Sequence, residues 1–238
     1  MRAARNAGSP IGTHGRTRVD RRCPDVTTCP RRTVRAVTHA DVETHPVGPQ
    51  GMGDLAVLFE TYRNTRHCWC MAFCTTRRQF AAGWMTGGNR RRFETAATSG
   101  EEPMGVLAYA LGEPIGWCAC GPRSRYVDAG GRRRKLLRDR SPEEDEVVWL
   151  LPCLFVGPDY RGRGFTHTLA RAAVELARTH GAVAIEGWPL SGSERQSDDA
   201  FVGRQPMFEE LGFRFVSSPE PQRAIVRLEL TGAAGSQA

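Results

Sequence analysis

The sequence predicts a mixed α/β fold in which helices flank a mostly antiparallel sheet. The first observation behind this prediction is a strand, turn, helix and strand unit that extends from Val147 to Gly187. The second is a pair of apolar segments, 104–110 and 114–120, separated only by Leu111-Gly112-Glu113. A link this short predicts a hairpin, and therefore antiparallel strands, ahead of the strand-helix-strand unit.

The unit begins with an apolar run at residues 147–156. A nearly unbroken apolar run is typical of a strand that is buried on both faces. Pro152 interrupts the run, and because proline has no N–H to donate, we expect a sheet edge or a β-bulge there. Gly181 stands where the C-cap of the following helix is expected. That helix is predicted by apolar residues at helical spacing, namely Phe165, Leu169, Ala172, Ala173, Leu176 and Ala177.

The turn before the helix contains Gly162 and Gly164. Glycine lets the backbone take left-handed dihedrals and approach a ligand closely. The first N–H groups of the helix are unpaired and carry partial positive charge, so a phosphate or pyrophosphate would suit them. The alternative is an ordinary strand-to-helix turn. The turn is not a P-loop, because no Gly-Lys-Ser/Thr follows, and it lacks the third glycine of a dinucleotide-binding fingerprint.

Several motifs resemble the GNAT superfamily of N-acetyltransferases. Residues 160–166 are similar to the acetyl-CoA loop of that family, residues 110–117 to its central hairpin, and residues 207–213 to its closing helix, turn and strand. The similarity covers residues 33–230. Two further segments resemble an uncharacterised bacterial branch of the superfamily, namely Cys68-Trp69-Cys70-Met71 and residues 183–189.

The resemblance implies a fold and a cofactor. In the family, the fourth and fifth strands splay apart and the pantetheine arm of acetyl-CoA enters the gap. Here Pro152 and Cys153 would mark the point of separation, and the main-chain groups of Leu154, Phe155 and Val156 would pair with the arm. The turn and the start of the helix would hold the pyrophosphate through Arg161, Gly162, Arg163, Gly164, Phe165 and Thr166.

The resemblance also implies an enzyme that moves the acetyl group directly to an amine, in a small molecule or a peptide. Residues 62–99 would shape the acceptor site.

Two residues depart from the family pattern. Thr166 replaces the last Gly or Ala of the loop, so its side chain must point away from the phosphates. Phe208 stands where many members place a tyrosine general acid, and a phenyl ring cannot donate a proton. A non-catalytic acyl-CoA-binding or regulatory module is therefore the alternative.

Acetyl transfer to an ammonium group needs a base that takes its proton. Glu186 is the first candidate, because it lies in an otherwise apolar strand beside the expected gap. Glu146, at the head of the preceding strand, is the second candidate. The alternative for Glu186 is a structural carboxylate that pairs with an arginine.

The cluster His67–Cys74 contains three cysteines and a histidine within eight residues. Cys-x-Cys is poor zinc spacing, and no paired second knuckle follows. We therefore predict no metal site and expect the cysteines to pack in the apolar interior near the acceptor cleft.

Residues 121–146 form a long charged excursion inside the domain. A loop of this length is unusual unless it is functional or mobile. It is either a lid or a contact for the cofactor phosphates, or a solvated loop whose basic and acidic ends pair.

The net charge of +7 is concentrated at the start of the chain of 238 residues. Residues 1–32 are rich in arginine and lack apolar periodicity, which predicts a disordered extension. Residues 33–231 would form the acetyltransferase domain, which would open with an edge strand at 33–37, and residues 232–238 would be a flexible tail. A basic arm can bind nucleic acid electrostatically. A nucleic-acid-associated protein is the less favoured alternative, because no aromatic residue lies among the basic ones.

No apolar run reaches the ~18 residues of a membrane span. The start of the chain also lacks the apolar core of a signal peptide. We therefore expect a cytoplasmic protein without a membrane partner, whose eight cysteines are reduced thiols. The sequence does not identify the acceptor, and it leaves a homodimer open.

Overall fold

The computed structural model describes residues 37–130, 133–191 and 201–230. The expected extension at residues 1–32 and the expected tail at 232–238 lie outside the described residues, and so does most of the strand expected at 33–37. The domain boundaries therefore stay a prediction.

Seven strands in the described part of the chain form one sheet. Their order is β1-β2-β3-β4-β5-β7-β6, and every neighbouring pair is antiparallel except β4 and β5, which are parallel. This mixed, mostly antiparallel sheet confirms the fold class that the sequence predicts. The strands are β1 Val42–Pro46, β2 Gly105–Ala110, β3 Glu113–Pro122, β4 Val148–Val156, β5 Ala184–Gly187, β6 Arg214–Glu220 and β7 Arg223–Glu229.

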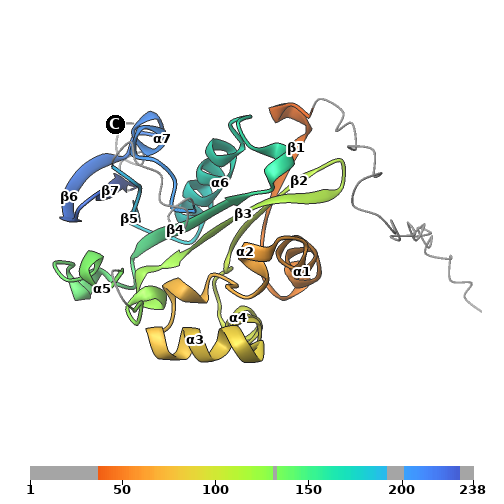
Figure 1. The fold of residues 1–238 in the computed structure, drawn as a ribbon. Helices are drawn as coiled ribbons and strands as arrows, with labels where there is room; N and C mark the ends of the chain where they lie inside the picture. The colour runs from red at the N-terminus through yellow and green to blue at the C-terminus, as the bar shows by residue number, and fades with distance from the viewer. Residues whose placement is uncertain (1–36, 131–132, 192–200, 231–238) are drawn as a thin grey trace, which may run out of the picture. The chain divides into compact units, whose positions relative to one another are not determined.

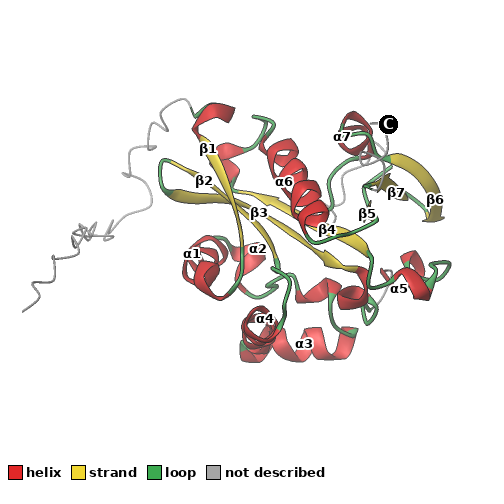
Figure 2. Cartoon of the chain, turned by 180° about the vertical axis from the view of Figure 1, so that it is seen from behind, coloured by secondary structure: helices red, strands yellow, loops and turns green. Residues whose placement is uncertain are grey.

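Helices cover both faces of the sheet (Figure 1). Helix α6, Phe165–Thr179, packs on one face against β2, β3 and β4. The view from behind in Figure 2 shows α1, α3 and α4 on the opposite side of the sheet from α6. The other helices are α1 Met52–Thr61, α2 Arg63–Arg66, α3 Arg77–Thr86, α4 Gly88–Ser99, α5 Arg133–Leu136 and α7 Gln205–Glu210.

Helix α6 forms where the apolar spacing predicts it. Its face toward the sheet is buried, including Phe165, Leu169 and Ala173. The helix ends at Thr179, and Gly181 follows with a φ of +74°, the left-handed conformation that favours glycine. The C-cap itself is His180, so the predicted glycine stands one residue beyond it and ends the helix there. The other end of the helix begins at the glycine turn.

Two elements differ from expectation. Strand β1 lies at Val42–Pro46, a segment whose residue pattern does not indicate a strand, because β1 is defined by main-chain pairing with the edge of β2 while most of its side chains stay exposed. Helix α3 was not expected. Thr76 caps it: its Oγ1 accepts from the Gln79 N–H, while Oε1 of Gln79 accepts from the Thr76 N–H. This Thr-x-x-Gln capping box is a signal that the sequence does contain.

An aromatic cluster lies between the sheet and the helices on the α1 side. Phe59, Trp69, Phe93 and Trp117 contact one another with ring centroids 5.2 to 6.0 Å apart. All four side chains are almost fully buried. Because Trp117 pairs with Phe155 across β3 and β4, this cluster supports the part of β4 where the site is expected.

Candidate active site

Strands β4 and β5 part in the middle of β4. Their parallel pairing runs from Val148 opposite Ala184 to Leu151 opposite Gly187 and then stops, although β4 continues to Val156. The other side of β4 is irregular at the same point, where Leu151 and Pro152 together stand opposite one residue of β3. Pro152 therefore sits in a β-bulge, as predicted, and the strands separate where the missing N–H was expected to break the ladder.

The edge of β4 beyond the bulge presents main-chain groups of Leu154 and Val156 to the gap. The N–H of Leu154 donates to the carbonyl oxygen of Phe201, and the carbonyl oxygen of Val156 accepts from Nε of Arg161 at 3.0 Å. Since main-chain groups alternate in direction along a strand, Phe155 between them turns its own groups toward β3. Of the three strand residues predicted for this role, Leu154 and Val156 therefore direct main-chain hydrogen-bonding groups into the gap, and Phe155 does not.

The segment at Phe201 occupies part of this gap. In addition to the hydrogen bond to Leu154, the ring of Phe201 lies 5.9 Å from that of Phe155. Val202 is buried, and the carbonyl oxygen of Gly203 accepts from the N–H of Leu190. The chain after β5 thus crosses back over the free edge of β4.

The turn after β4 contains two glycines in an unusual conformation and is open at the first of them. Gly162 has a φ of +73° and Gly164 a φ of +78°, so both are in the left-handed region. No atom outside its chain neighbours lies within 4 Å of where a Cβ of Gly162 would stand. Gly164 is the N-cap of α6, so the first amides of this helix are directed to the same opening. The turn therefore has the space and the polarity for an anion.

His39 lies against this turn from a distant part of the chain. Its Nδ1 is 3.1 Å from Oγ1 of Thr168, and its ring packs edge-on against Phe165 with centroids 5.2 Å apart. A Cβ on Gly164 would stand 3.1 Å from both Cε1 and Nε2 of the imidazole. No motif marks this exposed histidine in the sequence, and sequence analysis missed it.

Glu186 is buried in a cluster of ion pairs at the start of the gap. Nη1 of Arg123 donates to both of its carboxylate oxygens, at 3.0 and 3.1 Å, and Nη1 of Arg227 donates to Oε1 at 3.2 Å. Nε of Arg123 also donates to Asp145 at 2.8 Å. The hydrogen bond from Arg227 lowers the pKa of Glu144 in the same cluster. Arg123 is therefore the centre of the cluster. The sequence does not distinguish it from the other arginines of the excursion.

The second predicted base, Glu146, lies apart from Glu186. It is exposed just before β4 begins, and its Oε2 accepts from the hydroxyl of Ser124 at 3.1 Å. The point of strand separation lies beyond Leu151, further along β4. The structure thus does not bring the two carboxylates together.

Phe208 lies directly at the gap, on α7. It is fully buried, and its ring packs edge-on against Phe213 with centroids 5.1 Å apart. A Cβ on Gly187 would stand 2.6 Å from its Cε1, so the ring fills the space beside the last paired residue of β5. At this position beside the gap, Phe208 therefore lacks the hydroxyl that a tyrosine would have.

The cysteines behave as apolar side chains. The indole N–H of Trp117 donates to Sγ of Cys70 at 3.2 Å. Burial raises the pKa of the Cys68 and Cys74 thiols to about 12, so both are protonated at neutral pH. No group of three or more His, Cys, Asp or Glu side chains within the described residues has the arrangement of a metal site.

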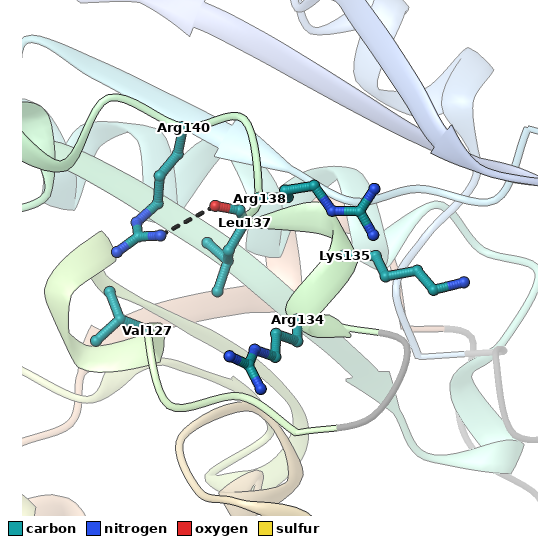
Figure 3. A pocket seen from close by; sticks show the side chains of 6 residues that line it. All are labelled: Val127, Arg134, Lys135, Leu137, Arg138 and Arg140. Carbon is teal, nitrogen blue, oxygen red and sulfur yellow. Dashed lines mark hydrogen bonds between the residues drawn. The ribbon is translucent and has the colours of Figure 1, made fainter.

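The excursion before β4 carries an open basic hollow with a volume of about 680 Å³. Figure 3 shows the hydrogen bond from Arg140 to the carbonyl oxygen of Leu137 on one of its walls. Arg140 also pairs with Asp145, and Lys135 pairs with Glu220. This pairing of basic with acidic side chains favours a solvated loop over a lid. The hollow is lined by Val127, Arg134, Lys135, Leu137, Arg138 and Arg140.

The family model for the acetyltransferase (GNAT) family matches residues 69–213, which include the gap, the glycine turn and α6. The chain belongs to the GNAT acetyltransferase family. It is therefore an acetyltransferase, and acetyl-CoA is the acyl donor of this family. No curated protein matches the sequence.

Solved structures of similar fold include other acetyltransferases. A GNAT-family acetyltransferase from Listeria monocytogenes is 13% identical, with 79% of this chain and 95% of that chain covered and a TM-score of 0.49. The polyamine N-acetyltransferase from Drosophila melanogaster is 14% identical, with 80% and 100% covered and a TM-score of 0.48. The PaiA N-acetyltransferase from Thermoplasma acidophilum, in complex with coenzyme A, is 11% identical, with 79% and 98% covered and a TM-score of 0.46.

Among the described residues of this acetyltransferase, no helix is both long enough and apolar enough to cross a membrane.

Proposed function

We propose that this acetyltransferase moves the acetyl group of acetyl-CoA directly to an amine. The observation that carries the proposal is the separation of β4 and β5 on the same strand that leads into an open glycine turn. A ligand with a polar arm and a pyrophosphate can use both features at once. When bound, acetyl-CoA supplies the reactive thioester.

The main-chain groups of Leu154 and Val156 would pair with the amides of the pantetheine arm, and the buried side chain of Phe155 would support it. Gly162 leaves room for a pyrophosphate, which would fill the opening that a Cβ would otherwise occupy. The phosphates would be held mainly by the backbone amides of the turn and of the start of α6, in the segment made of Arg161, Gly162, Arg163, Gly164, Phe165 and Thr166.

For the proton that the ammonium acceptor must lose, we keep Glu186 as the first candidate and Glu146 as the second. Glu186 is favoured because it lies on β5 one residue before the pairing with β4 ends. Its hydrogen bonds to Arg123 and Arg227 support the structural alternative equally well. Substitution of Glu186 distinguishes a general base from a structural carboxylate.

The proposed acceptor is an amine of a small molecule or a peptide, with residues 62–99 shaping its site. The cytoplasm is the proposed compartment, because the cysteines of the described residues are free thiols, as a reducing environment favours. A homodimer is compatible with this function.

An acyl-CoA-binding module without activity is the second candidate function. The observation that favours it is the phenyl ring of Phe208 at the gap.

Calorimetric titration of acetyl-CoA tests the cofactor site. We expect the parent protein to bind, and we expect Gly164→Glu to bind at least a hundredfold more weakly, because it places a carboxylate at the proposed pyrophosphate position. Gly181→Glu is the matched control. It also replaces a glycine of positive φ, +74°, but at the far end of α6, so it carries the same backbone strain without touching the turn.

Equal loss of binding in both glycine variants would show that strain alone is responsible. Absence of binding by the folded parent would overturn the proposed cofactor site. If the parent binds acetyl-CoA but releases no coenzyme A with any of a panel of amines, the non-catalytic module is favoured.

A further inference from the structure

His39 is held by α6 in a fixed orientation. Nδ1 lies within hydrogen-bond distance of Oγ1 of Thr168, one turn into the helix, and the ring packs edge-on against Phe165. With these two contacts in place, Cε1 and Nε2 of the imidazole lie against Gly164. A side chain that is held in this way adds little entropy cost when it binds a ligand.

Nε2 has no hydrogen-bond partner among the described residues, although it lies at the opening of the turn. An imidazolium ion donates from both nitrogens, so Nδ1–H would donate to Thr168 and Nε2–H to an acceptor at the turn. The first amides of α6 are directed to the same opening. His39 therefore supplies a side-chain donor where the glycines supply only backbone donors.

The charges around His39 favour an anion at the turn. The N-terminal end of a helix is electropositive and attracts negative charge. Arg161 and Arg163 on the turn add positive charge. On the segment of His39 itself, Asp41 is bonded to Thr38.

The other histidine of α6 is engaged elsewhere. His167 lies 2.7 Å from a carboxylate oxygen of Glu210. The acidic residue nearest to the turn in the sequence is Asp159, in the short 3-10 helix Pro158–Tyr160.

We propose that His39 binds the pyrophosphate of acetyl-CoA through Nε2–H. The inference rests on the proposed function, because it places acetyl-CoA in this turn. It adds to the family loop a residue from the segment before β1, about 120 residues away in the sequence.

The test is calorimetry with acetyl-CoA and with dephospho-CoA, which keeps the pyrophosphate but lacks the 3′-phosphate. His39→Phe keeps an aromatic ring against Phe165 and loses both nitrogens. We expect it to bind both ligands about tenfold more weakly than the parent, the typical effect of one lost charge-assisted hydrogen bond. His45→Phe is the control, because this exposed histidine lies on β1 and contacts Tyr109 instead of the turn.

A second variant gives a readout that a merely structural role would not change. His39→Arg loses the imidazole but restores a hydrogen-bond donor with a permanent positive charge, so it should recover affinity for both ligands.

Each outcome decides between the alternatives. Unchanged affinity in His39→Phe, with the parent still binding acetyl-CoA, would overturn the role of His39 and leave the proposed function intact. A loss seen with acetyl-CoA but not with dephospho-CoA would place the contact at the 3′-phosphate and overturn the assignment to the pyrophosphate. Failure of the parent to bind either ligand would count against the proposed function itself.

Discussion

The main-chain N–H of Leu154 donates to the carbonyl oxygen of Phe201, at the edge of β4 from which β5 has already separated. The same N–H is the group that we propose for the pantetheine arm. One hydrogen atom cannot make both bonds at full strength. On this proposal, binding of acetyl-CoA would require the segment at Phe201 to move away from β4.

This competition predicts that weakening the segment strengthens cofactor binding. In Phe201→Ala the ring contact with Phe155 is lost, which removes about 1 kcal/mol of aromatic packing from the occluded state. Because the apparent affinity scales with the fraction of molecules that are open, we expect acetyl-CoA to bind up to about fivefold more tightly. Calorimetry measures the affinity, and stopped-flow fluorescence shows whether the association rate rises.

Phe215→Ala is the control for this prediction, because it also removes a phenyl ring but from an exposed position on β6. It should leave acetyl-CoA binding unchanged. Weaker binding by Phe201→Ala would instead show that Phe201 supports the bound arm, and the idea of competition would be wrong.

The parts of the site that follow from the sequence are those within one continuous segment. The bulge at Pro152 depends on a local property, the missing N–H, and the turn at Gly162 and Gly164 leads directly into a helix with clear apolar spacing. Both are therefore predictable from residue type and spacing. The GNAT resemblance added the separation of β4 and β5, which residue patterns alone do not indicate.

The contacts that sequence reasoning missed join residues that are far apart in the chain. His39 meets Gly164 and Phe201 meets Leu154 only in the folded chain. For Glu186 the sequence analysis raised an arginine partner but did not identify it as Arg123. An exposed histidine and one arginine among many have no periodic or motif signal. Their roles depend on tertiary packing, which a single sequence does not reveal.

Arg123 is predicted to contribute strongly to stability, because its guanidinium is buried between two carboxylates. Nε donates to Asp145 and Nη1 to Glu186, and its side chain is only 2% exposed. Arg123→Met would leave buried negative charge with fewer partners, which typically costs about 3 to 5 kcal/mol. Urea unfolding followed by circular dichroism measures the change in the free energy of unfolding.

Arg178→Met provides the comparison, because Arg178 pairs with Glu175 on the exposed surface of α6. An exposed pair of this kind contributes about 0 to 1 kcal/mol. Similar small losses in both variants would mean that the Arg123 cluster is no more important than a surface ion pair, contrary to its burial.

The role of Glu186 is decided by separating turnover from stability and cofactor binding. Glu186→Gln keeps an oxygen that can accept from Arg123, but it cannot take a proton. If Glu186 is the general base, we expect the release of coenzyme A with an accepted amine to fall by about 10² to 10⁴-fold. The affinity for acetyl-CoA should stay unchanged, because neither the proposed phosphate contacts nor the proposed pantetheine contacts involve this side chain.

Glu146→Gln should lose far less activity, since Glu146 is exposed and its carboxylate accepts from Ser124 before β4 begins. If Glu186→Gln instead retains turnover and unfolds at a lower urea concentration, then Glu186 serves the ion cluster, and the activity of Glu146→Gln decides whether the second candidate is the base.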